Sequence, residues 1–105
     1  MKRRHYAFEF TPRSAEHLAA LSAQDRALVV DSIERQIRYQ PTVEMRNRKR
    51  MDPDKRLYIA PWELRVGHLR VYYAVKEEPE PKLVIVAIGE KDRDRIRIGG
   101  ESIEP

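Results

Sequence analysis

The segment 61–75, PWELRVGHLRVYYAV, constrains the fold more than any other part of this sequence. Apolar residues alternate with polar ones before and after Gly67 and His68, a pattern typical of a β-hairpin closed by a two-residue turn. That turn sets Arg65 opposite Arg70, on the same face of the hairpin because side chains alternate across a strand. The opposite face is wholly apolar. The remaining predicted pairs are Val66 with Leu69, Leu64 with Val71, Glu63 with Tyr72, and Trp62 with Tyr73.

The facing arginines need an explanation, because like charges directly opposite each other destabilise a sheet by about 0.2 to 1 kcal/mol. Glu63 lies on the same predicted face and offers one explanation, a salt bridge that partly neutralises the pair. The other explanation is an anionic ligand held by both guanidinium groups. The sequence leaves both interpretations open, and we favour the second.

Composition limits the class of protein. The chain has 105 residues, which predicts one domain spanning 1–105. Its 21 Lys and Arg exceed its 17 Asp and Glu, and the net charge of +4 favours an anionic partner such as a nucleic acid or an acidic protein. There are no cysteines, so disulfides, thiolate metal sites and cysteine nucleophiles are excluded.

Neither a signal peptide nor a membrane-spanning segment is expected, because the sequence lacks both the roughly 7- to 15-residue apolar run of the former and the ~18-residue run of the latter. We therefore expect a cytoplasmic protein. The three histidines, His5, His17 and His68, are far apart and show no metal-binding spacing. The sequence thus predicts no metal site and no cofactor.

The remaining patterns predict an α+β fold. Residues 6–10 alternate as a half-buried strand, Thr11 and Pro12 are typical of a helix start, and two helices are expected to about residue 21 and over 24–39. Residues 42–59 are expected to be irregular and basic. The β-branched run 83–88 predicts a strand that is buried on both faces, and therefore central, and that ends at Gly89; residues 96–99 could add an edge strand. The expected architecture is an N-terminal strand, a helical hairpin, and a mainly antiparallel sheet of three to four strands with both helices on one face. The face carrying the two arginines is expected to be open.

Such an open basic face suits the chemistry of RNA phosphodiesters. The guanidinium group of arginine can donate two hydrogen bonds to phosphate oxygens, and it stays charged. Arg65 and Arg70 are therefore candidates to stabilise a phosphorane transition state without a metal. Lys91 and Arg93 follow the central strand and could join them. His68 could titrate near neutrality, or simply be exposed in its turn, and Tyr72 could stack on a base, or simply pack. The candidates for binding the RNA backbone upstream are Arg46, Arg48, Lys49 and Arg50, in a segment that could also be a solvated loop.

The ordered set of a strand, two helices, RNRKR, the hairpin LRVGHLRVYY and the stretch VAIGEKDR resembles the RelE/ParE superfamily of toxins from type II toxin–antitoxin systems. The resemblance covers nearly the whole chain and implies a small α+β toxin. In RelE-like members it implies an endoribonuclease that cuts mRNA on the ribosome without metal or small-molecule cofactor, leaving a 2′,3′-cyclic phosphate and a 5′-hydroxyl. It implies phosphate-binding roles for Arg65, Arg70 and Lys91. The implied partners are a cognate antitoxin with an acidic, conditionally folded segment and mRNA on the ribosome, with no membrane involved.

Two departures from the family pattern leave other functions open. RelE-like nucleases often carry a Tyr or His near the C-terminus, where this chain reads RDRIRIGGE, and Glu63 stands where some relatives have a catalytic lysine. The alternatives are a ParE-like toxin that inhibits DNA gyrase without catalysis, and an inactive relative that only binds an antitoxin or RNA.

Overall fold

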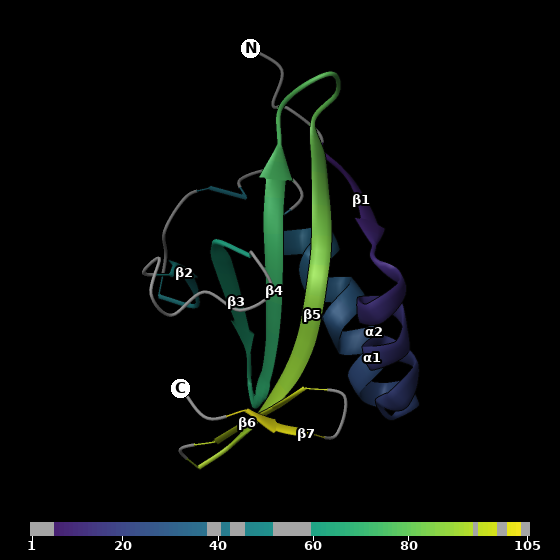
Figure 1. Ribbon diagram of the computed structural model, residues 1–105, viewed down its shortest axis with the longest axis vertical. Helices are drawn as coiled ribbons and strands as arrows, with labels where there is room; N and C mark the ends of the chain where they lie inside the picture. The colour runs from purple at the N-terminus through teal and green to yellow at the C-terminus, as the bar shows by residue number, and fades with distance from the viewer. Residues whose placement is uncertain are drawn as a thin grey trace.

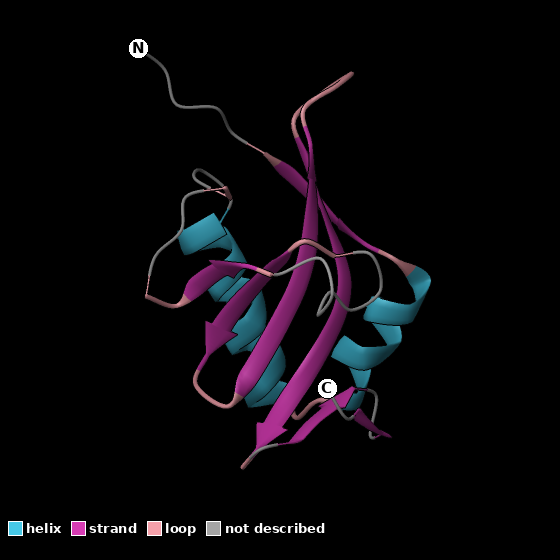
Figure 2. Ribbon diagram, turned by 60° about the vertical axis from the view of Figure 1, so that its left-hand side comes forward, coloured by secondary structure: helices cyan, strands magenta, loops and turns pink. Residues whose placement is uncertain are grey.

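In the computed structural model, the described residues are 6–37, 41–42, 46–51, 60–93, 95–98 and 101–103. They form two helices against one face of a curved, mainly antiparallel sheet (Figures 1 and 2). The elements are β1 (Ala7–Phe10), α1 (Pro12–Ala20), α2 (Ala23–Ser32), the π-helical turn η1 (Ile33–Ile37), β2 (Arg48–Arg50), β3 (Trp62–Val66), β4 (Leu69–Lys76), β5 (Lys82–Asp92), β6 (Arg95–Ile98) and β7 (Glu101–Ile103).

The hairpin of β3 and β4 has the predicted register. Trp62 pairs with Tyr73, Arg65 with Arg70, and Val66 with Leu69. Gly67 occupies the first turn position with φ +59°, a backbone conformation that glycine adopts at no steric cost. The alternation of apolar residues and the turn glycine are therefore enough to fix this register.

The strand order is β2-β3-β4-β5-β6-β7, and β1 pairs with β5 in parallel. Strand β5 is central because it pairs with β4 on one edge, while β1 and β6 pair with its first and last residues, respectively. Figure 1 shows β5 as a long curved strand that runs between β4 and β1 and reaches the short strands β6 and β7. The predicted fold class, with both helices on one face, is confirmed.

The main core lies between the helices and the apolar face of the sheet. Val29 and Ile33 from the helical layer and Leu64, Val71 and Ile85 from the sheet are all fully buried. Fully burying one such side chain contributes about 1.5 to 3 kcal/mol, so this interface supplies most of the hydrophobic stabilisation.

Helix α1 begins where the sequence predicted. The Thr11 hydroxyl accepts a hydrogen bond from the Ser14 amide at 3.1 Å, and Pro12 follows at the first helical position. Two side chains then bind the helix to β5: Ser14 Oγ donates to the Ile85 carbonyl at 2.6 Å, and His17 Nδ1 accepts from the Ile88 amide at 3.2 Å. Polar groups thus fix the position of α1 on the sheet.

Four details of the sequence-based expectation differ from the structure. The sheet is larger than three to four strands, with β2 inside the basic segment and β7 beyond β6, so β6 is not an edge. Strand β5 does not end at Gly89 but continues to Asp92, because β6 pairs with its last four residues. Helix α2 ends at Ser32 and continues as η1, while residues 38 and 39 of the expected helix lie outside the described residues. The run 83–88 is buried mainly on its helix-facing side, with Val84 and Val86 only half-buried.

Within the described part of the chain, no helix is both long enough and apolar enough to cross a membrane.

Candidate functional site

The candidate site is the sheet face turned away from the helices, which we call the arginine face. Strand register places on it six residues from four adjacent strands: Lys49, Glu63, Arg65, Arg70, Tyr72 and Lys91. Lys49 is opposite Glu63, Arg65 is opposite Arg70, and Arg70 is opposite Gly89, two residues before Lys91. Because residues two apart on a strand share a face, these charged groups form a stripe across the sheet.

Arg65 is the exposed arginine of the pair. Its side chain is 46% exposed, and its Nε lies 3.0 Å from Oε1 of the largely buried Glu63. The salt bridge that the sequence offered as a structural explanation is therefore present. Arg65 keeps the rest of its guanidinium group at the surface, where it can still contact an anion.

Arg70 differs from its partner because it is only 8% exposed. Its Nη1 donates to the carbonyl oxygens of Gly67 at 2.7 Å and Leu69 at 2.9 Å, folding the side chain back onto the hairpin turn. The prediction of two exposed forks side by side is therefore wrong for Arg70. Like-charge repulsion is relieved because each arginine has its own acceptor, Glu63 for Arg65 and turn carbonyls for Arg70.

Tyr72 is fully buried in a second, smaller core, with Ala60, Ala87 and Ile98. Burial raises the pKa of its phenol well above the usual range, and the Glu63 carboxylate raises the pKa further, while Arg70 and Arg65 lower it. Its hydroxyl has no hydrogen-bond partner of normal geometry among the described residues. The phenol is therefore protonated at neutral pH, and its ring is not accessible for the expected base stacking.

The expectation of an open face thus needs correction around Tyr72. Ile98 of β6 covers this part of the sheet, and the partly buried Met51 and Ile96 pack against the same small core. These contacts bring together segments far apart in the chain, which the hairpin pattern alone does not indicate.

The basic segment is divided by the alternation of β2. Lys49 is exposed on the arginine face, whereas Arg48 is 2% exposed and donates from Nη2 to the Gln36 carbonyl at 3.0 Å. Burial lowers the pKa of Arg48 below its ordinary value. Arg50 is exposed, with its guanidinium carbon 5.9 Å from the centroid of the Trp62 ring on the helix-facing side. The predicted RNA-binding set is therefore not one continuous row, and the buried Arg48 does not fit it.

The other predicted cations are at the surface. Arg46 is exposed in the turn before β2, and Lys91 and Arg93 are exposed at the end of β5, with Arg93 at φ 58°. The Lys91 amide donates to the His68 carbonyl at 2.7 Å, which holds the end of β5 against the hairpin turn. Lys91 is thus positioned on the arginine face by both register and this bond.

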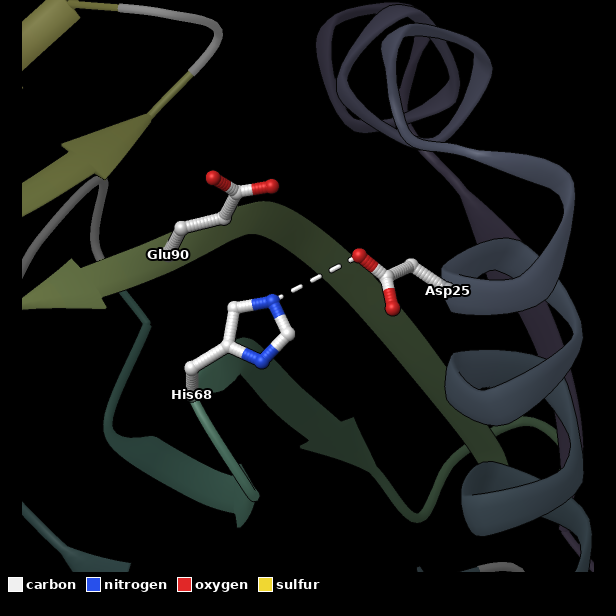
Figure 3. A group of neighbouring side chains, drawn as sticks. All are labelled: Asp25, His68 and Glu90. Carbon is white, nitrogen blue, oxygen red and sulfur yellow. Dashed lines mark ion pairs between the residues drawn. The ribbon is translucent and has the colours of Figure 1, made fainter.

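His68 is not grouped with the arginines. Its Nε2 lies 3.4 Å from Oδ2 of Asp25 on α2, so its side chain is turned towards the helical layer (Figure 3). Glu90 on β5 completes a cluster of three possible metal ligands. Sequence reasoning missed Asp25 and Glu90 because each is separated from His68 by more than twenty residues, without any motif spacing.

The arginine face has exposed positive charges that suit the binding of a polyanion. Lys49, Arg65 and Lys91 present exposed cations from three of its four strands, while Arg70 holds the turn. Among the six residues named above for this face, Glu63 is the one acidic residue, and its carboxylate contacts the exposed arginine directly. No described residue of the face offers an exposed imidazole or phenol.

Comparison with known proteins identifies the fold. No family model matches the sequence, and no curated protein matches it. Among solved structures, the chain is similar to a chain of the toxin–antitoxin complex RelBE2 from Mycobacterium tuberculosis, with a TM-score of 0.69 and 22% identity over 86% of this chain and 95% of that one. At this identity the likeness shows the fold alone, and the RelE-like α+β fold expected from the sequence is confirmed.

Proposed function

We propose that this chain is the toxin of a type II toxin–antitoxin system and that it cleaves mRNA on the ribosome through its arginine face. The RelE-type fold supports a toxin. The observation that carries the RNA target is the set of exposed cations, Lys49, Arg65 and Lys91, on the sheet face that the helices leave uncovered. Phosphate contacts from such side chains supply most of the sequence-independent affinity for RNA.

In the proposed reaction, the 2′-oxygen of one nucleotide attacks the adjacent phosphorus, and the bond to the 5′-oxygen of the next nucleotide breaks. The products are a 2′,3′-cyclic phosphate and a 5′-hydroxyl. Arg65 stabilises the negative charge on the phosphorane oxygens, and Lys49 and Lys91 hold the RNA backbone beside it. Glu63 accepts the 2′-hydroxyl proton, since its carboxylate is beside Arg65, and the leaving 5′-oxygen takes a proton from water.

The direct test is cleavage in a translating extract. Wild-type protein is added, and the 5′ ends of a reporter mRNA are mapped and checked for hydroxyl termini. Arg65→Gln is expected to reduce cleavage at least about tenfold, as expected for loss of a transition-state contact. Arg35→Gln is a matched control because Arg35 is an exposed arginine on the helical turn η1, paired with Asp31. Intact mRNA in the presence of wild-type protein would refute the nuclease proposal.

The proposed partner is an antitoxin whose acidic segment binds the chain. Coexpression of a small acidic protein from a neighbouring reading frame should abolish growth arrest by the wild type. Binding should be recovered as a complex of defined stoichiometry. Growth arrest that no such protein relieves would argue against a toxin–antitoxin pair.

One observation favours a second candidate, a toxin that acts only by binding. Tyr72 is buried and His68 is turned to the helices, so the described part of the arginine face lacks the aromatic groups considered for stacking and proton transfer. The proposed target in this case is DNA gyrase. Inhibition of supercoiling by purified gyrase, with Arg65→Ala still toxic, would identify this function instead of RNA cleavage.

A further inference from the structure

Three side chains that could bind a metal ion meet at one end of the molecule, on the helix-facing side of the hairpin turn. Asp25 comes from the first turn of α2, His68 from the turn between β3 and β4, and Glu90 from β5. One ligand atom of each lies within 4.8 Å of the others, and Figure 3 shows the three groups facing a common space. The cluster is separate from the arginine face.

The backbone of each residue is fixed by its own local contact. The Asp25 amide donates to the Ser22 hydroxyl at 3.1 Å, which anchors Asp25 at the start of α2. The His68 carbonyl accepts from the Lys91 amide at 2.7 Å, and Glu90 is paired with Leu69 across β4 and β5. The fold therefore brings the three residues together without any help from an ion.

The separations suit a small divalent cation. His68 Nε2 and Asp25 Oδ2 are 3.4 Å apart. In a tetrahedral site with metal–ligand bonds of about 2.1 Å, two ligand atoms are separated by about 3.4 Å. The Glu90 carboxylate needs only side-chain rotation to reach the same spacing, because its backbone is already in place and its side chain has three rotatable bonds.

We propose that Asp25, His68 and Glu90 form a binding site for a zinc-like divalent cation. One imidazole nitrogen and two carboxylate oxygens are ligands that zinc accepts, and the two negative charges balance the charge of the ion. The His68 side chain is 54% exposed and the Asp25 side chain 23%, so the site is accessible and leaves a fourth position for water. The bound ion links α2 to the hairpin turn and to β5.

Because the ligands belong to the helical layer and to the sheet, the ion stabilises the packing between them. Anything that binds the folded state and not the unfolded state raises the free energy of unfolding. The site requires neither RNA nor an antitoxin, so it does not rest on the proposed toxin function.

The test uses the full chain after treatment with a chelator. Zn²⁺ is titrated calorimetrically, and Co²⁺ is added as a spectroscopic probe, because its visible absorption reports the number and type of ligands. We expect one equivalent to bind with micromolar or tighter affinity and the thermal midpoint to rise with Zn²⁺. Asp25→Asn, His68→Ala and Glu90→Gln should each weaken binding about tenfold or more.

Two matched variants serve as controls. Asp31→Asn removes an exposed carboxylate from the same helix, and His5→Ala removes another histidine; both should bind Zn²⁺ as the wild type does. Circular dichroism shows whether each variant is folded. Glu90→Gln leaves the His68–Asp25 ion pair intact, so a loss of Zn²⁺ binding in this variant is not caused by loss of that pair. Absence of stoichiometric binding, or equal affinity in the three ligand variants and the wild type, would overturn the proposal.

Discussion

At the scale of single residues, Glu63 determines how much of the arginine face is available to RNA. Its carboxylate is bonded to Arg65 and lies close enough to Tyr72 to raise the pKa of that phenol. In the proposed reaction the same carboxylate also accepts a proton. Pairing with Arg65 weakens RNA binding, whereas accepting the proton promotes cleavage. The two roles of Glu63 can therefore be separated by experiment.

The first prediction concerns Glu63→Gln. Loss of the charge frees Arg65, so RNA should bind more tightly, by about fivefold at most, since a partly exposed ion pair contributes up to ~1 kcal/mol. Cleavage should nevertheless become slower, because an amide does not accept the 2′-hydroxyl proton. Fluorescence anisotropy and the mapped 5′ ends measure the two effects. Faster cleavage together with tighter binding would show that Glu63 only neutralises Arg65.

The second prediction separates the two arginines by stability. Arg70→Ala should lower the free energy of unfolding by about 1 to 3 kcal/mol, because the carbonyls of Gly67 and Leu69 lose their charged donor. Arg65→Ala should lower it by less, up to about 1 kcal/mol, because its ion pair with Glu63 is partly exposed. Urea denaturation measures both. Equal losses for the two variants would contradict the different roles assigned to them.

At the scale of elements, α1 and β5 are joined by buried polar contacts as well as by apolar packing. His17 accepts the Ile88 amide, which requires an unprotonated Nδ1. Burial lowers the pKa of His17, Arg13 lowers it further, and Glu16 raises it. The contact between helix and strand is therefore sensitive to acid.

The third prediction is a pH dependence of stability. The pKa of His17 is lower in the folded state than in the unfolded state, so the unfolded state binds more protons as the pH falls through about 6.5, the ordinary histidine value. The free energy of unfolding should decrease from pH 7.5 to pH 5.5. His17→Gln should be less stable at pH 7.5, by about 1 to 2 kcal/mol, and should lose less on acidification. Equal losses in both proteins would exclude His17 as the cause.

The fourth prediction tests how closely β5 and β6 approach at Gly89. A Cβ atom there would lie 2.9 Å from the Arg97 carbonyl oxygen and 2.9 Å from Cγ1 of Ile98. Gly89→Ala should therefore destabilise the protein by about 1 to 3 kcal/mol, as overpacking does. Gly67→Asn is a suitable contrast, because nothing lies within 4 Å of the added atom and asparagine tolerates positive φ. A stable Gly89→Ala variant would mean that β6 is not held against β5 as described.

At the scale of the whole molecule, charge is distributed unevenly between the two sides of the sheet. The helix-facing side buries Arg48 and leaves Asp25 and Glu90 beside His68, while Lys49, Arg65 and Lys91 are exposed on the arginine face. The net charge of +4 is thus less informative than the distribution of charged side chains over the surface. On the arginine face, an RNA strand would meet three exposed cations from adjacent parts of one sheet.

The fifth prediction is the salt dependence of RNA binding. If three cations each neutralise one phosphate, the logarithm of the binding constant should fall with the logarithm of salt concentration with a slope of about −2 for single-stranded RNA. Arg65→Gln should reduce the slope by about 0.7, and Arg35→Gln should leave it unchanged. Binding that does not depend on salt would rule out the arginine face as a phosphate-binding surface.

Local patterns were sufficient for much of the fold. Period-2 alternation and Gly67 predicted the hairpin register residue by residue, and Thr11 with Pro12 predicted the start of α1. These features depend on neighbours in the chain, because side-chain alternation, turn conformation and helix capping are set within a few residues. The fold class followed from the order of such elements.

The sequence by itself therefore determined which residues lie on which face of the hairpin, whereas the tertiary structure decided which of them remain accessible. Arg70 and Tyr72 have the predicted register, but neither is accessible. The Arg70 guanidinium is hydrogen-bonded to turn carbonyls, and Tyr72 is buried among Ala60, Ala87 and Ile98. Likewise, His68 meets Asp25 and Glu90 only because α2 and β5 pack beside its turn. Burial and clustering depend on contacts between segments distant in the chain, and no spacing along the sequence encodes those contacts.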